Sequence, residues 1–157
     1  MLSSDTTLTS LPHTVLFLCT GNYYRSRYAE ILFNWTARQR GLDWIADSRG
    51  LRLEPRNPGP ISQLTVRGLL QLGITVEEPI RYPLPATVAD FHSAQHVVAV
   101  KEAEHRPMIE QFFPDWLDRV EFWRVDDVDY AGPDVALPEL QRNVAALIER
   151  LTMTTSD

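Results

Sequence analysis

The sequence predicts an α/β protein with an open parallel sheet that is covered by helices on both faces. Short apolar runs alternate along the chain with longer segments that have the periodicity of helices. Residues 15–18 are wholly apolar, and residues 95–100 are apolar after Gln95 and His96, which is typical of strands buried on both faces. No internal repeat, low-complexity tract or linker divides the chain, so we expect a single domain.

The first strand is expected at residues 14–20, and residues 26–40 follow as a helix. One face of this helix carries apolar residues at helical spacing: Tyr28, Ala29, Leu32, Phe33 and Trp35. Gly41 stands where a glycine commonly ends a helix. A short second strand is expected within residues 43–48. Residues 52–60 contain three prolines and a glycine, and they are predicted to form a loop.

Ser62 can cap the next helix, which runs to about Leu72 and ends at Gly73. Its inward residues are predicted to be Val66, Leu69 and Leu70. Residues 77–85 contain three prolines and are expected to be irregular.

The second half of the chain supplies two further strands and two helices. Residues 95–100 form a strand, and residues 120–125 are a candidate for another. Between them lies a helix that stops before Pro114 and buries Met108, Ile109, Phe112 and Phe113. The last helix is expected to start near Pro138, and its buried face consists of Leu140, Val144, Leu147, Ile148 and Leu151.

Composition limits the class of protein. The chain has 157 residues and a formal net charge of −6, which argues against a nucleic-acid partner or an anionic membrane surface. No apolar run approaches the length of a membrane span, and the single cysteine gives no sign of an oxidising compartment. We expect a cytoplasmic monomer with a flexible leader at residues 1–12, a domain at 13–152 and a frayed tail at 153–157.

The most informative segment links the first strand to the first helix. It begins at Cys19, continues through Thr20, Gly21, Asn22, Tyr23 and Tyr24, and reaches Arg25 and Ser26. A short loop between a strand and a helix points its N–H groups and the helix N-terminus into one concavity, which favours an anion. A thiol in such a cradle loses its proton easily, because the field that attracts phosphate also stabilises a thiolate.

These residue types fit attack on a phosphate ester. Cys19 can act as the nucleophile, and Arg25 can offer a planar fork to two phosphoryl oxygens. Ser26 can either hydrogen-bond the thiolate or cap the helix. Residues 126–130 also follow a strand, so they are expected at the same edge of the sheet as Cys19. A carboxylic acid from this segment could therefore protonate the leaving oxygen. This chemistry needs neither a metal nor another cofactor.

The loop resembles the signature of the low-molecular-weight protein tyrosine phosphatases, Cys-x-Gly-Asn-x-Cys-Arg-Ser followed by Pro-x-Ala-Glu. Residues 48–50, 97–102 and 123–128 resemble further family segments more weakly. The resemblance implies an open four-stranded parallel sheet and hydrolysis of phosphotyrosine, in a protein or a small aryl phosphate. It also implies Cys19 as nucleophile, Arg25 as phosphate clamp, Asn22 and Ser26 as loop support, and Asp127 as general acid.

Four residues depart from the family pattern. Tyr24 replaces the second loop cysteine, which removes a disulfide partner that could protect an oxidised Cys19. Val128 replaces the proline after the acid, so Asp126 or Asp129 could serve instead of Asp127. Where the family often has two tyrosines, this chain has Asp129 and then Tyr130, and Tyr23 could supply the missing aromatic surface. Finally, Arg27 replaces the proline after Arg-Ser.

Three alternatives to a tyrosine phosphatase remain. An arsenate reductase on the same fold would need additional cysteines, which the chain does not have. A non-catalytic phosphate or phosphoprotein binder is favoured by the altered acid segment. A flavodoxin-type nucleotide module would leave Cys19 and Arg25 without a role. The four histidines have no metal-ligand spacing, so structural or surface positions are expected for them.

Overall fold

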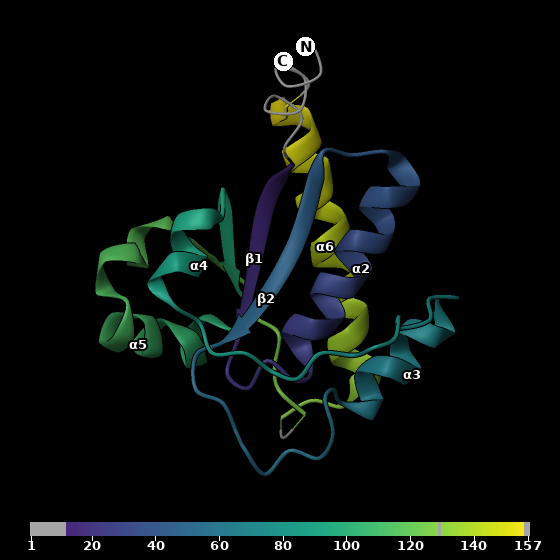
Figure 1. The fold of residues 1–157 in the computed structure, drawn as a ribbon, viewed down its shortest axis with the longest axis horizontal. Helices are drawn as coiled ribbons and strands as arrows, with labels where there is room; N and C mark the ends of the chain where they lie inside the picture. Colours follow the sequence, from purple (N-terminus) through teal and green to yellow (C-terminus); the bar gives the residue numbers. More distant parts are fainter. Residues whose placement is uncertain (1–11, 129, 156–157) are drawn as a thin grey trace.

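The computed structural model describes residues 12–128 and 130–155 and contains one four-stranded sheet (Figure 1). The strands are β1 (His13–Cys19), β2 (Trp44–Gly50), β3 (His96–Ala99) and β4 (Val120–Phe122). They lie in the order β2-β1-β3-β4, and every neighbouring pair is parallel. This arrangement confirms the predicted open parallel sheet.

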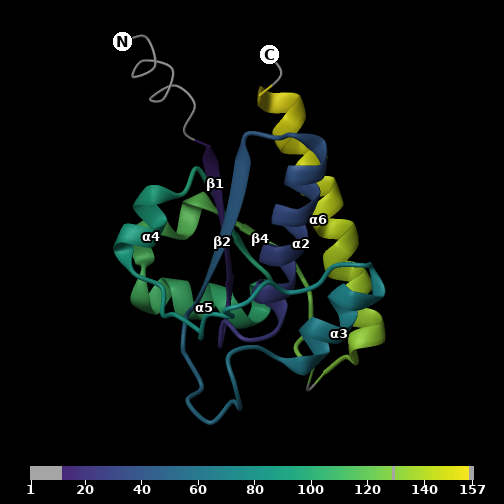
Figure 2. The same ribbon diagram turned by 45° about the vertical axis from the view of Figure 1, so that its right-hand side comes forward.

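Helices cover both faces of the sheet. One face packs against α2 (Arg25–Arg40), α3 (Gln63–Gln71) and α6 (Pro133–Thr155). The other face packs against α4 (Val88–Ser93), α5 (Glu102–Phe112) and the 3-10 helix η1 (Pro114–Arg119). The two groups lie on opposite sides of the strands in Figures 1 and 2.

The central strand β1 has no solvent face, which is why its sequence is a continuous apolar run. Val15 and Phe17 belong to the core on the side of α2 and α6. Leu16 and Leu18 belong to the core on the side of α4 and α5. Successive residues of a strand point to opposite faces, so each helical layer receives half of the run.

The helices of the first half follow the predictions with two differences. Of the five residues predicted for the apolar face of α2, four are buried and Trp35 is only partly buried. Gly41 ends α2 with φ 65°, a left-handed conformation that glycine adopts without strain. Ser62 caps α3 by accepting from the backbone N–H of Leu64. The prediction for Leu70 was wrong: this side chain is 60% exposed, because α3 packs through Thr65 and Leu69, one turn apart.

The second half departs further from the predictions. The short helix α4 was not predicted, although Thr87 and Asp90 form a capping box at its start. Phe112 is 47% exposed, and the neighbouring ring of Phe113 packs on Phe91 instead. Helix α6 begins at Pro133, five residues before the predicted start, and continues to Thr155. Of the predicted leader (residues 1–12) and frayed tail (residues 153–157), residues 1–11 and 156–157 lie outside the described residues, and residues 153–155 belong to α6 instead.

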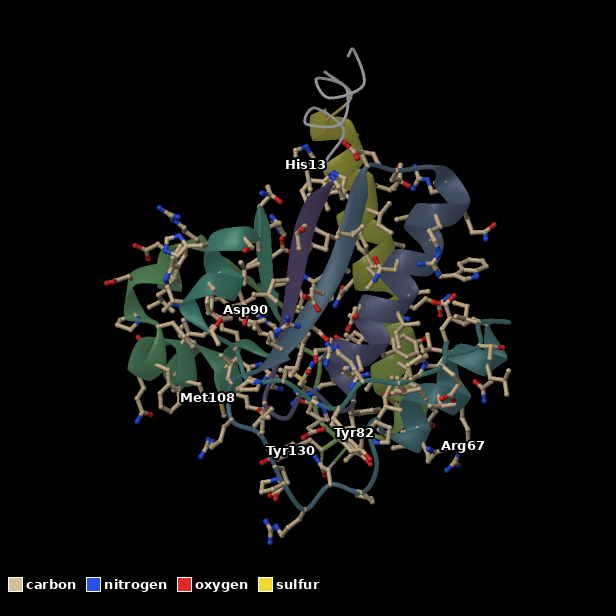
Figure 3. The ribbon with its side chains drawn as sticks, in the orientation of Figure 1. His13, Arg67, Tyr82, Asp90, Met108 and Tyr130 are labelled. Atoms are coloured by element: carbon tan, nitrogen blue, oxygen red, sulfur yellow. The ribbon has the colours of Figure 1, made fainter. Side chains whose placement is uncertain are left out.

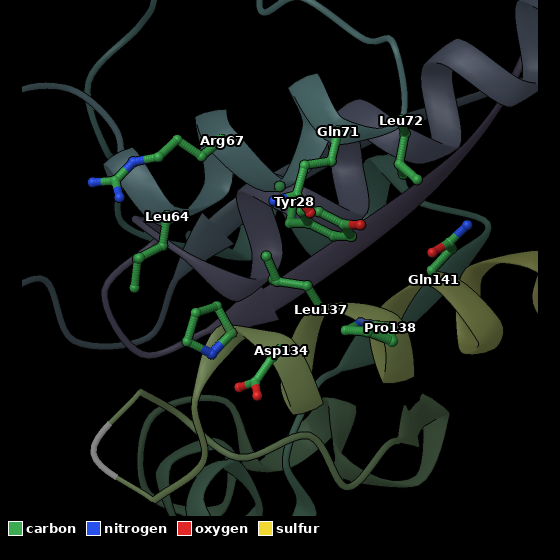
Figure 4. A pocket seen from close by; sticks show the side chains of 11 residues that line it. Tyr28, Leu64, Arg67, Gln71, Leu72, Asp134, Leu137, Pro138 and Gln141 are labelled. Carbon is green, nitrogen blue, oxygen red and sulfur yellow. The ribbon is translucent and has the colours of Figure 1, made fainter.

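An apolar cavity of about 260 Å³ lies between α3 and the start of α6 (Figure 4). Its walls include Leu64, Leu72 and Leu137, with the polar ends of Arg67 and Asp134 nearby. None of the helices in the described part of the chain is long and apolar enough to cross a membrane.

The end of β2 fixes the loop that follows β1. Cys19 pairs with Gly50 across the sheet, and Arg52 N–H donates to the carbonyl of Thr20 at 2.9 Å. A Cβ atom at position 50 would lie 2.8 Å from the carbonyl oxygen of Thr20 and 3.1 Å from the backbone nitrogen of Asn22. Position 50 therefore has no room for a side chain without moving the backbone of the loop.

We predict that Gly50→Ala lowers the free energy of unfolding by about 1–3 kcal/mol, as overpacking typically does. Urea denaturation would measure this change. Gly132→Ala is the matched control, because a Cβ there would meet only the movable carboxylate of Asp134. Equal unfolding midpoints for Gly50→Ala and the unaltered chain would contradict the close approach.

Candidate active site

The loop between β1 and α2 lies at the carboxyl edge of the sheet and lines a cavity of about 360 Å³. Ligands bind at this edge in open α/β sheets. The lining residues come from the loop, from the loop after β2, from the start of α3 and from the segment after β4: Cys19, Thr20, Gly21, Tyr23, Tyr24, Arg25, Glu54, Asn57, Ser62, Leu64, Asp127 and Val128.

The thiol of Cys19 has a built-in hydrogen-bond partner. Its Sγ lies 2.9 Å from the hydroxyl oxygen of Ser26. That oxygen accepts from the side-chain amide of Asn22 at 3.0 Å, which leaves its own hydrogen free to donate to the sulfur. Of the two roles that the sequence allowed for Ser26, the geometry favours support of the thiolate.

Asn22 holds the loop in its turn. It has φ 53°, in the left-handed region that asparagine tolerates better than most residues. Its amide donates to the hydroxyl of Ser48 at 2.9 Å, and its Oδ1 accepts from Arg81 at 2.9 Å and from the backbone N–H of Leu84 at 3.1 Å. Two segments distant in sequence, the end of β2 and residues 81–84, therefore fix one loop residue.

The guanidinium of Arg25 is 1% exposed, and three of its five N–H bonds are used within the protein. Glu104 accepts one bond from each terminal nitrogen at 3.1 Å, and the carbonyl of Val125 accepts the second bond of Nη1 at 3.0 Å. Nε has no partner, and one bond of Nη2 remains. These two lie on the same edge of the planar group, so they form a bidentate donor that no hydrogen bond occupies, although the carboxylate of Asp127 lies 3.6 Å from Nη2.

Glu104 and His105 extend this cluster behind the loop. The Glu104 carboxylate also accepts the hydroxyl of Thr20. Burial opposes ionisation of Glu104, but its hydrogen bonds with His105, Arg25 and Thr20 outweigh burial and hold the pKa of the carboxyl below its ordinary value. Burial lowers the pKa of His105. The Nδ1 atom of His105 accepts from the backbone N–H of Lys101, so Nε2 carries the proton in the neutral ring.

The structure separates the three candidate acids. Asp127 lines the cavity, with Oδ2 3.6 Å from Nη2 of Arg25. Asp126 is paired with Lys101, and it is not among the residues that line the cavity. Asp129 lies outside the described residues. Tyr130 and His13 lie at opposite ends of the molecule (Figure 3). The Tyr130 side chain is 81% exposed and does not line the cavity.

Tyr23 and Tyr24 form different parts of the wall. Tyr23 donates from its hydroxyl to the carbonyl of Pro58 at 2.6 Å, which anchors its side chain to the loop after β2. Tyr24 is 6% exposed, and its hydroxyl has no partner among the described residues. Burial, followed by the charge of Asp127, raises the pKa of Tyr24 to about 12, so the hydroxyl stays protonated.

Arg27 and Arg49 do not face the cavity. Arg27 is buried and donates to the carbonyls of Pro60 and Arg81. Burial, followed by the neighbouring charge of Arg81, lowers the pKa of Arg27 to about 10. Arg49 pairs with Asp47 and with Asp90. The extra positive charge predicted after Arg-Ser therefore contributes to the scaffold and leaves Arg25 as the one cation lining the described part of the cavity.

Glu104 and Arg81 were not among the predicted site residues. Neither belongs to the Cys19–Ser26 motif, and each reaches the loop from 59 or more positions away in sequence. Nothing local distinguishes Glu104 from Glu102, the other acid in the first turn of α5. For Ser48, the resemblance of residues 48–50 to a family segment was a usable signal.

Comparison with protein families gives a match to the low molecular weight phosphotyrosine protein phosphatase family over residues 14–152. The chain therefore belongs to this family of phosphatases. A search of curated proteins found no similar sequence.

Solved structures give the same fold. A low molecular weight protein tyrosine phosphatase from T. tengcongensis is 26% identical with a TM-score of 0.75, and the match covers 88% of this chain and 99% of that one. One from Bacillus subtilis is 25% identical, with a TM-score of 0.74 and coverage of 89% and 97%. The YwlE arginine phosphatase from Geobacillus stearothermophilus is 24% identical, with a TM-score of 0.72 and coverage of 91% and 95%.

We predict that Tyr24→Phe does not destabilise the protein and raises its free energy of unfolding by up to about 1 kcal/mol, because a buried hydroxyl without a partner is removed. If the hydroxyl donates to bound substrate, kcat/KM falls about 2–10-fold, the value of one hydrogen bond. Urea denaturation and steady-state kinetics measure the two effects. A loss of stability above about 1 kcal/mol would show that the hydroxyl has a structural partner.

Proposed function

We propose that the protein hydrolyses phosphotyrosine, in a protein or in a small aryl phosphate, through a cysteinyl-phosphate intermediate. One observation carries this proposal: the free Nε–Nη2 edge of Arg25 and the sulfur of Cys19 belong to residues that line the same cavity. A phosphoryl group held in two hydrogen bonds by that edge and by the loop N–H groups would meet the thiolate.

The reaction has two steps. In the first, the thiolate of Cys19 attacks phosphorus, the P–S bond forms as the P–O bond to the phenol breaks, and Asp127 gives a proton to the departing oxygen. In the second, water attacks phosphorus, the Asp127 carboxylate accepts its proton, and the P–S bond breaks. Phosphate leaves and the thiolate is restored. Ser26 donates a hydrogen bond to this thiolate before the first step and after the second.

The cavity walls favour an aromatic leaving group. Tyr23, Leu64 and Val128 give ring or aliphatic surface around the opening, and Asp127 stands among them. A phenyl ring packed on such surface gains hydrophobic contact and an aromatic neighbour. Tyr23, anchored to Pro58, takes the place of the aromatic surface that Tyr130 does not supply here.

Phosphoarginine is a second candidate substrate. Two of the similar structures are described as YwlE arginine phosphatases. In this chain, the wall of the cavity carries the carboxylates of Glu54 and Asp127, and its one lining cation, Arg25, already pairs with Glu104. A cationic guanidinium leaving group would therefore meet favourable charges, although Glu54 also pairs with Arg56.

We expect the purified protein to hydrolyse an aryl phosphate without added metal and Cys19→Ser to lose at least about 10³-fold in kcat, since a hydroxyl is a far weaker nucleophile than a thiolate. The same assay with phosphoarginine gives the ratio of kcat/KM values. A ratio in favour of the aryl ester supports the tyrosine assignment, and the reverse ratio overturns it. Phosphate binding without turnover of either substrate would instead support a non-catalytic binder.

The pH–rate profile identifies the acid. For an aryl phosphate, kcat should fall as the pH rises and the acid loses its proton. In Asp127→Asn this fall of kcat at high pH, the basic limb of the profile, should disappear. The value of kcat itself should fall by about 10²–10⁴, the usual contribution of a general acid. Asp126→Asn is the matched control, because Asp126 is paired with Lys101. Loss of the limb in Asp126→Asn or Asp129→Asn, with Asp127→Asn unaffected, would reassign the role.

A further inference from the structure

We propose that Glu104 is a positioning residue for phosphate binding, which determines the edge of Arg25 that faces the substrate. This inference rests on the proposed function, since it assumes that Arg25 holds a phosphoryl group. Glu104 lies in the first turn of α5, and Arg25 begins α2 on the opposite face of the sheet. The pair thus crosses the carboxyl edge of the sheet behind the cavity.

The contacts leave Arg25 one orientation. Both oxygens of Glu104 lie 3.1 Å from the two terminal nitrogens of the guanidinium, a parallel two-bond pairing that is specific in direction as well as distance. The carbonyl of Val125 holds Nη1 from the side at 3.0 Å. With these three bonds made, turning the guanidinium plane would break at least one of them. The Nε–Nη2 edge is what remains for a ligand.

The same carboxylate also ties down the loop. Oε2 of Glu104 accepts the hydroxyl of Thr20, the residue after the nucleophile, and His105 Nε2 lies 3.0 Å from that hydroxyl. His105 is fully buried, and the backbone N–H of Lys101 fixes its ring, so the hydroxyl of Thr20 has a second rigid neighbour. Glu104 therefore couples the orientation of Arg25 to the position of the loop that carries Cys19.

Positioning and simple charge compensation predict opposite results. If Glu104 only neutralises Arg25, removing its charge leaves a bare cation at the site, and phosphate should bind more tightly. If Glu104 fixes the free edge, removing the charge lets the guanidinium turn, and phosphate should bind more weakly. A displacement of about 1 Å at a reacting centre can reduce the rate about 10²-fold.

The test compares Glu104→Gln and Glu104→Asp with the unaltered chain. We expect Glu104→Gln to raise the inhibition constant of inorganic phosphate about tenfold or more and to lower kcat/KM by about 10–100-fold, with kcat falling as well as KM rising. Glu104→Asp keeps the charge but has a shorter reach, so it should show a smaller loss in the same direction. Glu102→Gln is the matched control: it lies on the same helix and pairs with Arg106 on the surface.

Tighter phosphate binding in Glu104→Gln, or unchanged phosphate binding and kinetics in both variants, would overturn the inference. Thermal unfolding of each variant shows whether it is folded, and Glu104→Asp keeps the test decisive if the glutamine variant is not. If the unaltered chain has no turnover, the proposed function fails. The dissociation constant of inorganic phosphate, measured by calorimetry, then still decides the role of Glu104.

Discussion

The guanidinium of Arg25 is a full positive charge with almost no contact with water, and this burial governs the organisation of the site. A buried cation is tolerated only when its donors are satisfied and an opposite charge lies close by. Here the acceptors come from α5 and from the segment after β4, both far from Arg25 in sequence. The edge without hydrogen bonds belongs to a residue that lines the cavity, where the proposed phosphoryl ligand would complete the set.

The burial also explains how an acidic protein can offer an anion site. The chain has a net charge of −6, so attraction by the whole surface does not concentrate phosphate at the cavity. The loop instead provides directed donors: backbone N–H groups at the start of α2 and one edge of a single arginine. Glu104 reduces the net charge at the site while it gives that arginine a direction.

The sequence was sufficient for several features whose responsible residues are neighbours in the chain. The continuous apolar run of β1, the cap at Ser62 and the Cys19–Arg25 loop are local patterns, and each lies where it was predicted. Helix α6 shows a competition between two prolines: Pro138 was taken as the first-turn residue, but Pro133, directly after Gly132, holds that place. The prediction that Leu70 is buried was wrong because the apolar pattern of α3 allows two faces, and packing selects the face that contains Leu69.

The rest of the site could not be predicted because it depends on the register between distant elements. Glu104 becomes important only when α5 lies beside the loop, and Arg81 only when an irregular segment crosses Asn22. Asp127 and Asp126 are adjacent in sequence, yet one lines the cavity and the other pairs with Lys101. A one-residue difference of this kind is settled by the backbone after β4, which has no regular pattern.

The partners of Arg25 also set the order in which a growing chain can become competent. Glu104 is 79 positions beyond Arg25, and Val125 is 100 positions beyond it. During synthesis from the N-terminus, the nucleophile loop and α2 leave the ribosome long before the groups that orient the arginine, and such long-range contacts carry a cost in loop closure. A nascent chain that ends before residue 104 has the complete Cys19–Arg25 motif but none of the acceptors that orient the arginine. On the proposed mechanism, the site is therefore completed late, because Asp127 and the acceptors of Arg25 lie far beyond the Cys19–Arg25 motif.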